Sequence, residues 1–146
     1  MRTTKLGQLT VSAQGLGCMG MSEWSGPADS PLGRGFLTAT VDLGSLDKKD
    51  FRSHNPRFTG EAGQKNLAIV EAVRKVADAK GVPAAQVALA WVYAQQERLG
   101  VNLAPIPGTK RVKWLEQNVA ALDVTLTPAE LTVLDPLATQ VVGPRY

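Results

Sequence analysis

The feature that most constrains this fold is a short apolar run that passes between two prolines into the start of a helix. Leu103, Ala104 and Ile106 form the run, which predicts a short inner strand rather than a surface strand. Gly108 and Thr109 end it, and threonine is a common N-cap, so we expect Thr109 to cap the helix that follows.

Basic residues gather where this helix begins. Lys110, Arg111 and Lys113 surround a helix N-terminus that already carries partial positive charge and free N–H groups. Cations at this place destabilise an isolated helix, so an anion is the natural partner, and a phosphate would satisfy both the amides and the cations. The alternative is a basic, solvated helix start that binds no ligand.

Composition excludes several classes of protein. The chain of 146 residues is long enough for one domain with a core, and its net charge of +3 is only mildly basic. No Lys/Arg run with interleaved aromatic residues predicts nucleic-acid binding, and no apolar run is long enough for a membrane span. The N-terminus lacks a signal-peptide pattern, so we expect a cytoplasmic protein. Metal-ligand spacing is absent, and the single Cys18 reads as a small buried residue.

The first residues predict a hairpin that leads into a strand. Two β-prone runs, from Met1 to Leu6 and from Leu9 to Ala13, flank a turn signal at Gly7-Gln8. The strand expected from Val11 to Leu16 then enters a glycine-rich segment whose small residues allow close backbone approach. No helix with dinucleotide-fingerprint spacing follows, so a Rossmann fold is not predicted.

Helical periodicity dominates the second half of the chain. We expect a polar loop over 39–65, helices over about 66–80 and 83–96, and a last helix opened by a capping box at Thr127. Gly81 should end the first of these helices. The helix that follows Thr109 should bury Val112, Leu115, Val119 and Leu122, and the last helix should bury Leu131, Leu134 and Leu137.

Several of these segments resemble the aldo-keto reductase family. The resemblance rests on M-R-T-T-K-L-G-x-L-x-V-S-A-x-G-L-G-C-M-G-M-S, S-P-L-G-R-G-F-L-T, D-F-R-S-H-N-P-R-F, K-G-V-P-A-A-Q-V-A-L-A-W-V and P-I-P-G-T-K-R-x-x-x-L-E-x-N. It implies an α/β fold, the (β/α)₈ barrel, whose N-terminal hairpin caps the floor. It also implies hydride transfer between NADPH and a small aldehyde or ketone.

The same resemblance assigns residues to the cofactor. Gly108, Thr109, Lys110 and Arg111 would line the pocket of the adenosine 2′-phosphate, and Gln117 and Asn118 would reach the adenine. Ser30, Leu32, Gly33 and Arg34 would meet the pyrophosphate in the loop after the seventh strand. Gly20 and Met21 would approach the nicotinamide.

The chain is too short for the whole barrel. A complete (β/α)₈ barrel takes about 250 residues. By the resemblance, the sequence passes at Asp29–Ser30 from the loop after the family's first strand directly to the loop after its seventh strand. We therefore predict one incomplete domain over 1–146: residues 1–29 supply the hairpin and first strand, and residues 30–146 the last strand-helix units. The alternative is an unrelated small fold. Such a partial barrel would leave a sheet edge open to self-association.

No catalytic residue is predicted. In the family a tyrosine protonates the carbonyl oxygen, assisted by a lysine, an aspartate and a histidine, and no segment here matches the units that carry them. Tyr93 and Tyr146 stand in other contexts, and His54 reads as a solvated loop residue. Two interpretations stay open: a family homologue that keeps its cofactor segments, or an inactive remnant that acts as a binding or oligomerising module.

Overall fold

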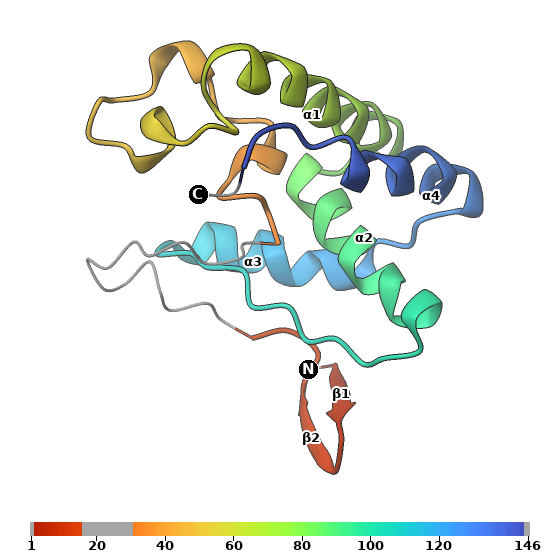
Figure 1. Cartoon of the computed structure of the whole chain (residues 1–146). Coiled ribbons are helices and arrows are strands. Elements are labelled where there is room, and N and C mark those ends of the chain that lie inside the picture. The colour runs from red at the N-terminus through yellow and green to blue at the C-terminus, as the bar shows by residue number, and fades with distance from the viewer. Residues whose placement is uncertain (1, 16–30, 145–146) are drawn as a thin grey trace.

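The computed structural model describes residues 2–15 and 31–144. Within these residues a two-stranded hairpin is attached to a helical body (Figure 1). The strands and α-helices are β1 (Thr3–Leu6), β2 (Leu9–Ser12), α1 (Gly60–Lys80), α2 (Ala84–Leu99), α3 (Val112–Ala120) and α4 (Pro128–Leu134). Short 3-10 helices join them: η2 (Phe36–Thr38), η3 (Leu43–Ser45), η4 (Phe51–His54), η5 (Ala121–Asp123) and η6 (Asp135–Thr139).

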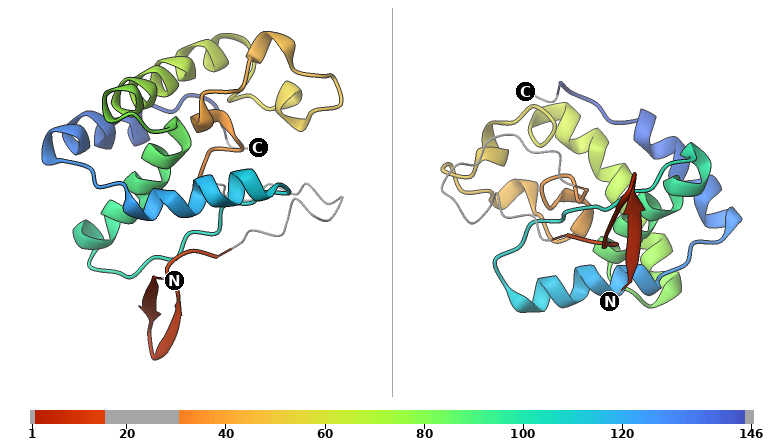
Figure 2. Two further views of the ribbon diagram at one scale, coloured as in Figure 1. Left: turned by 180° about the vertical axis from the view of Figure 1, so that it is seen from behind. Right: turned by 90° about the horizontal axis from the view of Figure 1, so that it is seen from below.

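The predicted hairpin is confirmed. β1 and β2 pair antiparallel with Leu6 opposite Leu9, and the turn falls at Gly7-Gln8. The hairpin projects away from the helices, as Figure 1 and the left view of Figure 2 show. Arg2 anchors it, because its guanidinium donates to the Leu122 carbonyl and lies 2.8 Å from an Asp123 carboxylate oxygen. The hairpin is therefore held by side chains at its base.

Both predicted barrel strands are wrong as regular strands. β2 already ends at Ser12, the described residues 13–15 continue it as a bend, and Leu16 lies outside the described part. Residues 101–107 are irregular, and Gly108 forms only an isolated bridge. The Gly15 amide donates to the Pro105 carbonyl at 3.0 Å, so the two segments do run side by side. A parallel strand needs neighbours along its whole length, and the regular sheet of the described residues consists of β1 and β2 alone.

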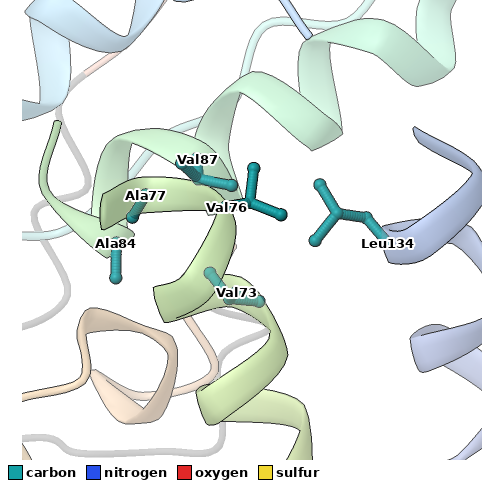
Figure 3. Close-up of a cluster of buried hydrophobic side chains, with 6 residues drawn as sticks. All are labelled: Val73, Val76, Ala77, Ala84, Val87 and Leu134. Carbon is teal, nitrogen blue, oxygen red and sulfur yellow. The ribbon is translucent and has the colours of Figure 1, made fainter. Parts of the chain in front are cut away.

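Helices α1 and α2 hold the centre of the core. Val87 and Leu89 of α2 are completely buried, and burying a side chain of this size contributes roughly 1.5–3 kcal/mol. Figure 3 shows the cluster where α1, α2 and α4 meet: Val73, Val76, Ala77, Ala84, Val87 and Leu134. A second cluster joins the loop at Leu32 to α2 and η5. The core is thus built between helices instead of between helices and a barrel.

The helix end predicted at Gly81 and the helix start predicted at Thr127 are confirmed. Gly81 ends α1 with a left-handed φ of 67°, and its amide donates to the Ala77 and Asp78 carbonyls. Thr127 and Glu130 form the predicted capping box of α4, with hydrogen bonds of 2.7 and 3.3 Å. The predicted loop over 39–65 is wrong at its end, because α1 already begins at Gly60.

The predicted buried face of α3 is wrong for two of its residues. Val112 is 70% exposed and Val119 is 47% exposed, whereas Asn118 is buried. Ile106, expected inside a strand, is 61% exposed. The other two predicted residues, Leu115 and Leu122, are half-buried, and within the described residues no sheet lies against α3.

Two polar contacts tie down the C-terminal part. The Asp135 carboxylate accepts the Trp91 indole N–H at 2.8 Å and pairs with Arg98 at 3.0 Å, which fixes η6 to α2. The buried Asn66 side chain exchanges two hydrogen bonds of 2.9 Å with the backbone of Val142. The C-terminal segment at Val142 therefore closes back onto α1.

Candidate dinucleotide site

The loop predicted to meet a pyrophosphate has an unusual backbone. Gly33, Arg34 and Gly35 have φ values of 56°, 57° and 87°, three successive residues in the left-handed region. Glycine enters this region freely, but Arg34 does so at a cost. The turn is closed by hydrogen bonds from the amides of Gly35 and Leu37 to the Leu32 carbonyl, at 3.0 and 3.2 Å. The loop therefore has a defined shape.

This loop is held in place by contacts with Phe51 and Arg52, and Asp50 binds Arg52. The Arg52 guanidinium donates to the Arg34 carbonyl at 3.3 Å, and the Arg34 guanidinium lies 4.9 Å from the centre of the Phe51 ring. Asp50 accepts hydrogen bonds from the Arg52 side chain at 2.6 and 3.0 Å. The hydrogen bond from Arg52 holds the pKa of the Asp50 carboxyl below its usual range, so the pair remains charged.

The second predicted segment stands at the start of α3. Val112 is the first helical residue and Arg111 the N-cap, so the prediction of Thr109 as N-cap is wrong. The Thr109 hydroxyl instead accepts the Arg111 amide at 3.2 Å, two residues along the chain, and closes a turn before the helix. Lys110 and Arg111 are exposed beside this turn. Their cationic groups can therefore reach an anion at the helix N-terminus.

The residues predicted to reach the adenine lie one to two turns further along α3. The Gln117 carbonyl accepts the Gln86 side-chain amide at 3.0 Å, and Asn118 is only 2% exposed. The Gln117 backbone thus ties α3 to α2, and Asn118 lies on the buried side of α3. Just beyond α3, Ala121 of η5 shares a buried cluster with Leu32 and α2. Helix α2 supports both predicted segments. An adenine contact by Gln117 or Asn118 stays a prediction, as do the remaining cofactor contacts.

Three of the predicted cofactor residues lie outside the described part of the chain. These are Gly20, Met21 and Ser30, together with the predicted junction at Asp29–Ser30.

The described tyrosine and histidine make structural contacts. The Tyr93 hydroxyl donates to the side-chain oxygen of the buried Gln14, and burial raises the pKa of Tyr93 to about 12. His54 is exposed and its ring donates to the Lys48 carbonyl at 2.7 Å, as expected for a loop histidine. Over residues 2–15 and 31–144, no three His, Cys, Asp or Glu side chains are grouped closely enough to hold a metal ion. The same residues contain no helix long and apolar enough to cross a membrane.

Sequence reasoning missed the contacts that Phe51 and Arg52 make with the loop and the ion pair that Asp50 makes with Arg52. The D-x-R spacing is a local signal, since it places the acid as N-cap of η4 and brings the two side chains together. Their contact with Arg34, 18 residues earlier, has no periodic signature.

Comparison with known proteins places the chain in a family. The profile described as "Aldo/keto reductase family" matches residues 28–138, so the chain belongs to the aldo/keto reductases. It is 42% identical over 120 residues to the aldo-keto reductase yakc [NADP(+)] of Schizosaccharomyces pombe, covering 80% of this chain and 34% of that protein. It is 38% identical over 112 residues to the aldo-keto reductase str7 of Strobilurus tenacellus, covering 76% of this chain and 32% of that protein.

The match therefore spans about a third of the length of these relatives. The family implies a (β/α)₈ barrel, and the described chain is a partial α/β fragment of it, with four α-helices and one two-stranded sheet.

Proposed function

We propose that this chain binds NADPH and that its binding site is the cofactor part of an aldo-keto reductase without the catalytic part. The observation that carries the proposal is the exposed pair Lys110 and Arg111 at the N-terminus of α3. A dianionic phosphate there would accept hydrogen bonds from the first-turn amides and neutralise both cations. The fission-yeast relative carries NADP(+) in its name, which supports the same cofactor for the matched segment.

The proposal predicts a preference between two dinucleotides. NADPH and NADH differ only by the 2′-phosphate, and Lys110 and Arg111 are the residues expected to contact it. A charge-assisted hydrogen bond contributes roughly 1.5–3 kcal/mol, so NADPH should bind at least about tenfold more tightly. Because the site is partial, its affinity should be lower than that of a complete enzyme.

Calorimetric titration with both dinucleotides tests this. Lys110→Ala should weaken NADPH binding and leave NADH binding unchanged. Lys75→Ala, a matched change at an exposed position of α1, should alter neither. Equal affinities for NADPH and NADH, or an unchanged NADPH affinity in Lys110→Ala, would contradict the proposal.

A second candidate function is a module that associates with another copy of itself. It is favoured by the exposed apolar side chains of Val112 and Val119 on α3, and of Ile106 in the extended segment before it. The open edge would be this segment, because the predicted strand there lacks a regular partner among the described residues. Light scattering behind size exclusion should then give a dimer that Val112→Ser weakens. A stable monomer at high concentration would count against this function.

A further inference from the structure

The loop at Gly33, Arg34 and Gly35 needs an external support to keep its shape. Two flexible glycines flank an arginine held at a φ of 57°, a conformation that a non-glycine residue leaves when nothing holds it. The backbone hydrogen bonds described for the turn join residues within 32–39. The buried side chains of Leu32 and Phe36 place its two ends on the molecule, and Arg34 lies between them.

Two contacts from one tripeptide provide that support. Arg52 donates to the Arg34 carbonyl at 3.3 Å, and the Phe51 ring lies 4.9 Å from the Arg34 guanidinium carbon. The main chain and the side chain of Arg34 are therefore held by adjacent residues. A β-carbon added at Gly35 would lie 3.4 Å from the Arg52 guanidinium, so the two segments are packed closely.

Arg52 is itself fixed before it reaches the loop. Its side chain makes hydrogen bonds of 2.6, 3.0 and 3.2 Å with the Asp50 carboxylate, and its backbone amide donates to the same carboxylate at 2.9 Å. Both side chains are about three-quarters buried, with 27% and 26% exposed. Two of the guanidinium nitrogens, Nε and Nη2, bind Asp50, and the third, Nη1, donates to the Arg34 carbonyl.

We infer that Asp50, Phe51 and Arg52 are positioning residues that hold the loop at Gly33–Gly35 in the shape that receives the diphosphate of the dinucleotide. The inference rests on the proposed NADPH binding and adds a control point away from the 2′-phosphate. Because the diphosphate is common to both dinucleotides, loss of this support should weaken NADPH and NADH by the same factor. Loss of Lys110 should instead weaken NADPH alone.

Calorimetric titration of Arg52→Gln with NADPH and NADH separates the two effects. We expect both affinities to fall about tenfold, the scale of a lost charge-assisted hydrogen bond, with the NADPH-to-NADH ratio unchanged. Phe51→Leu should also lower both affinities. Phe51→Tyr keeps an aromatic face under Arg34, so it should bind both dinucleotides as tightly as the wild type does. Arg74→Gln removes a more exposed ion pair, with Glu71 at 2.7 Å, and should leave both affinities at the wild-type level.

A measurement without ligand tests the loop itself. Trypsin cleaves after Arg34 only when the loop leaves its turn, so mass spectrometry should show this cut several-fold faster in Arg52→Gln and Phe51→Leu than in the wild type and Arg74→Gln. If Arg52→Gln does not fold, Asp50→Asn, which keeps both side chains and loses the charge, takes its place.

The outcomes separate the two proposals. Failure of the wild-type chain to bind either dinucleotide would overturn the proposed function and, with it, the positioning role. Wild-type binding that Arg52→Gln and Phe51→Leu leave unchanged would overturn the positioning role alone. An altered NADPH-to-NADH ratio in Arg52→Gln would also overturn it, because the residue would then act at the 2′-phosphate.

Discussion

At the scale of single residues, the buried amide of Asn66 attaches the C-terminal segment to α1. It is 3% exposed, and its side chain donates to the Arg57 and Val142 carbonyls and accepts the Val142 amide, each at 2.9 Å. An exchange of two bonds with one residue imitates a step of a β-ladder. The Asn66 side chain thus makes the hydrogen bonds with Val142 that the backbone of a neighbouring strand would make in a β-sheet.

Asn66→Ala should therefore lower the free energy of unfolding by about 2–3 kcal/mol, because it leaves buried backbone groups without partners. Urea denaturation followed by circular dichroism measures the change. Asn102→Ala, at an exposed position, should stay within about 0.5 kcal/mol of the wild type. Equal midpoints for the two variants would show that the Asn66 hydrogen bonds contribute nothing to stability.

The Tyr93 phenol gives the chain a dependence on alkaline pH. Burial raises its pKa from 10.0 to about 12, so the folded state keeps a proton that the unfolded state loses above pH 10. Stability should fall as the pH rises from about 10 to 12, since the unfolded state binds fewer protons there. Urea midpoints at pH 8, 10 and 11 should show this fall in the wild type and a smaller one in Tyr93→Phe. The same slope in both would place the effect elsewhere.

At the scale of elements, the junction between α1 and α4 depends on Glu130. Its side chain accepts the Thr127 amide at 2.7 Å and pairs with Lys80 at 3.0 Å. The hydrogen bond from the Thr127 backbone lowers the pKa of Glu130 below its ordinary 4.5. The ionised carboxylate stabilises the fold above pH 4.5, and this contribution is lost as the pH falls below that value.

Glu130→Gln should accordingly destabilise the chain at pH 7 and approach the wild type at pH 3.5, while Thr127→Ala should cost about 1 kcal/mol at both values. Urea denaturation at the two pH values measures both effects. Glu116→Gln, at an exposed position on α3, serves as the control. A Glu130→Gln effect that persists unchanged at pH 3.5 would mean that its charge is irrelevant.

Helices could be predicted from the sequence because their boundaries are local. Gly81 and Thr127 act within a few residues, and both act as expected. The strand expected at 103–106 could not be settled this way, since a strand exists only with a partner that periodicity does not identify. For the same reason Val112 was placed on the apolar side of α3, but its 70% exposure was not foreseen.

The candidate site divides in the same way. The cations at the start of α3 are visible in the sequence because a helix start is a local feature. The hydrogen bond from Arg52 to the Arg34 carbonyl depends on a left-handed loop and joins residues far apart in the sequence, so only the structure reveals it.

At the scale of the whole molecule, the chain alone should not reduce carbonyls. A positioned proton donor contributes roughly 10² to 10⁴-fold to such a reaction. Tyr93 is bound to Gln14 and has a pKa of about 12, so it is a poor donor near neutral pH. NADPH oxidation over a panel of aldehydes should remain at the uncatalysed rate in the wild type and in Tyr93→Phe. Turnover that Tyr93→Phe abolishes would assign the chemistry to this residue.

The contacts that attach the hairpin also predict the order in which parts of the chain fold. Arg2 reaches Leu122 and Asp123 across 120 and 121 residues of chain, and Gln14 meets Tyr93 across 79. Closing such long loops is slow, whereas α1 and α2 are joined by a turn and can meet early. We expect the helical body to assemble first and the hairpin to dock last. In reverse, the hairpin is the part that detaches at the lowest free energy, and its amides should exchange with deuterium well before those of α1 and α2.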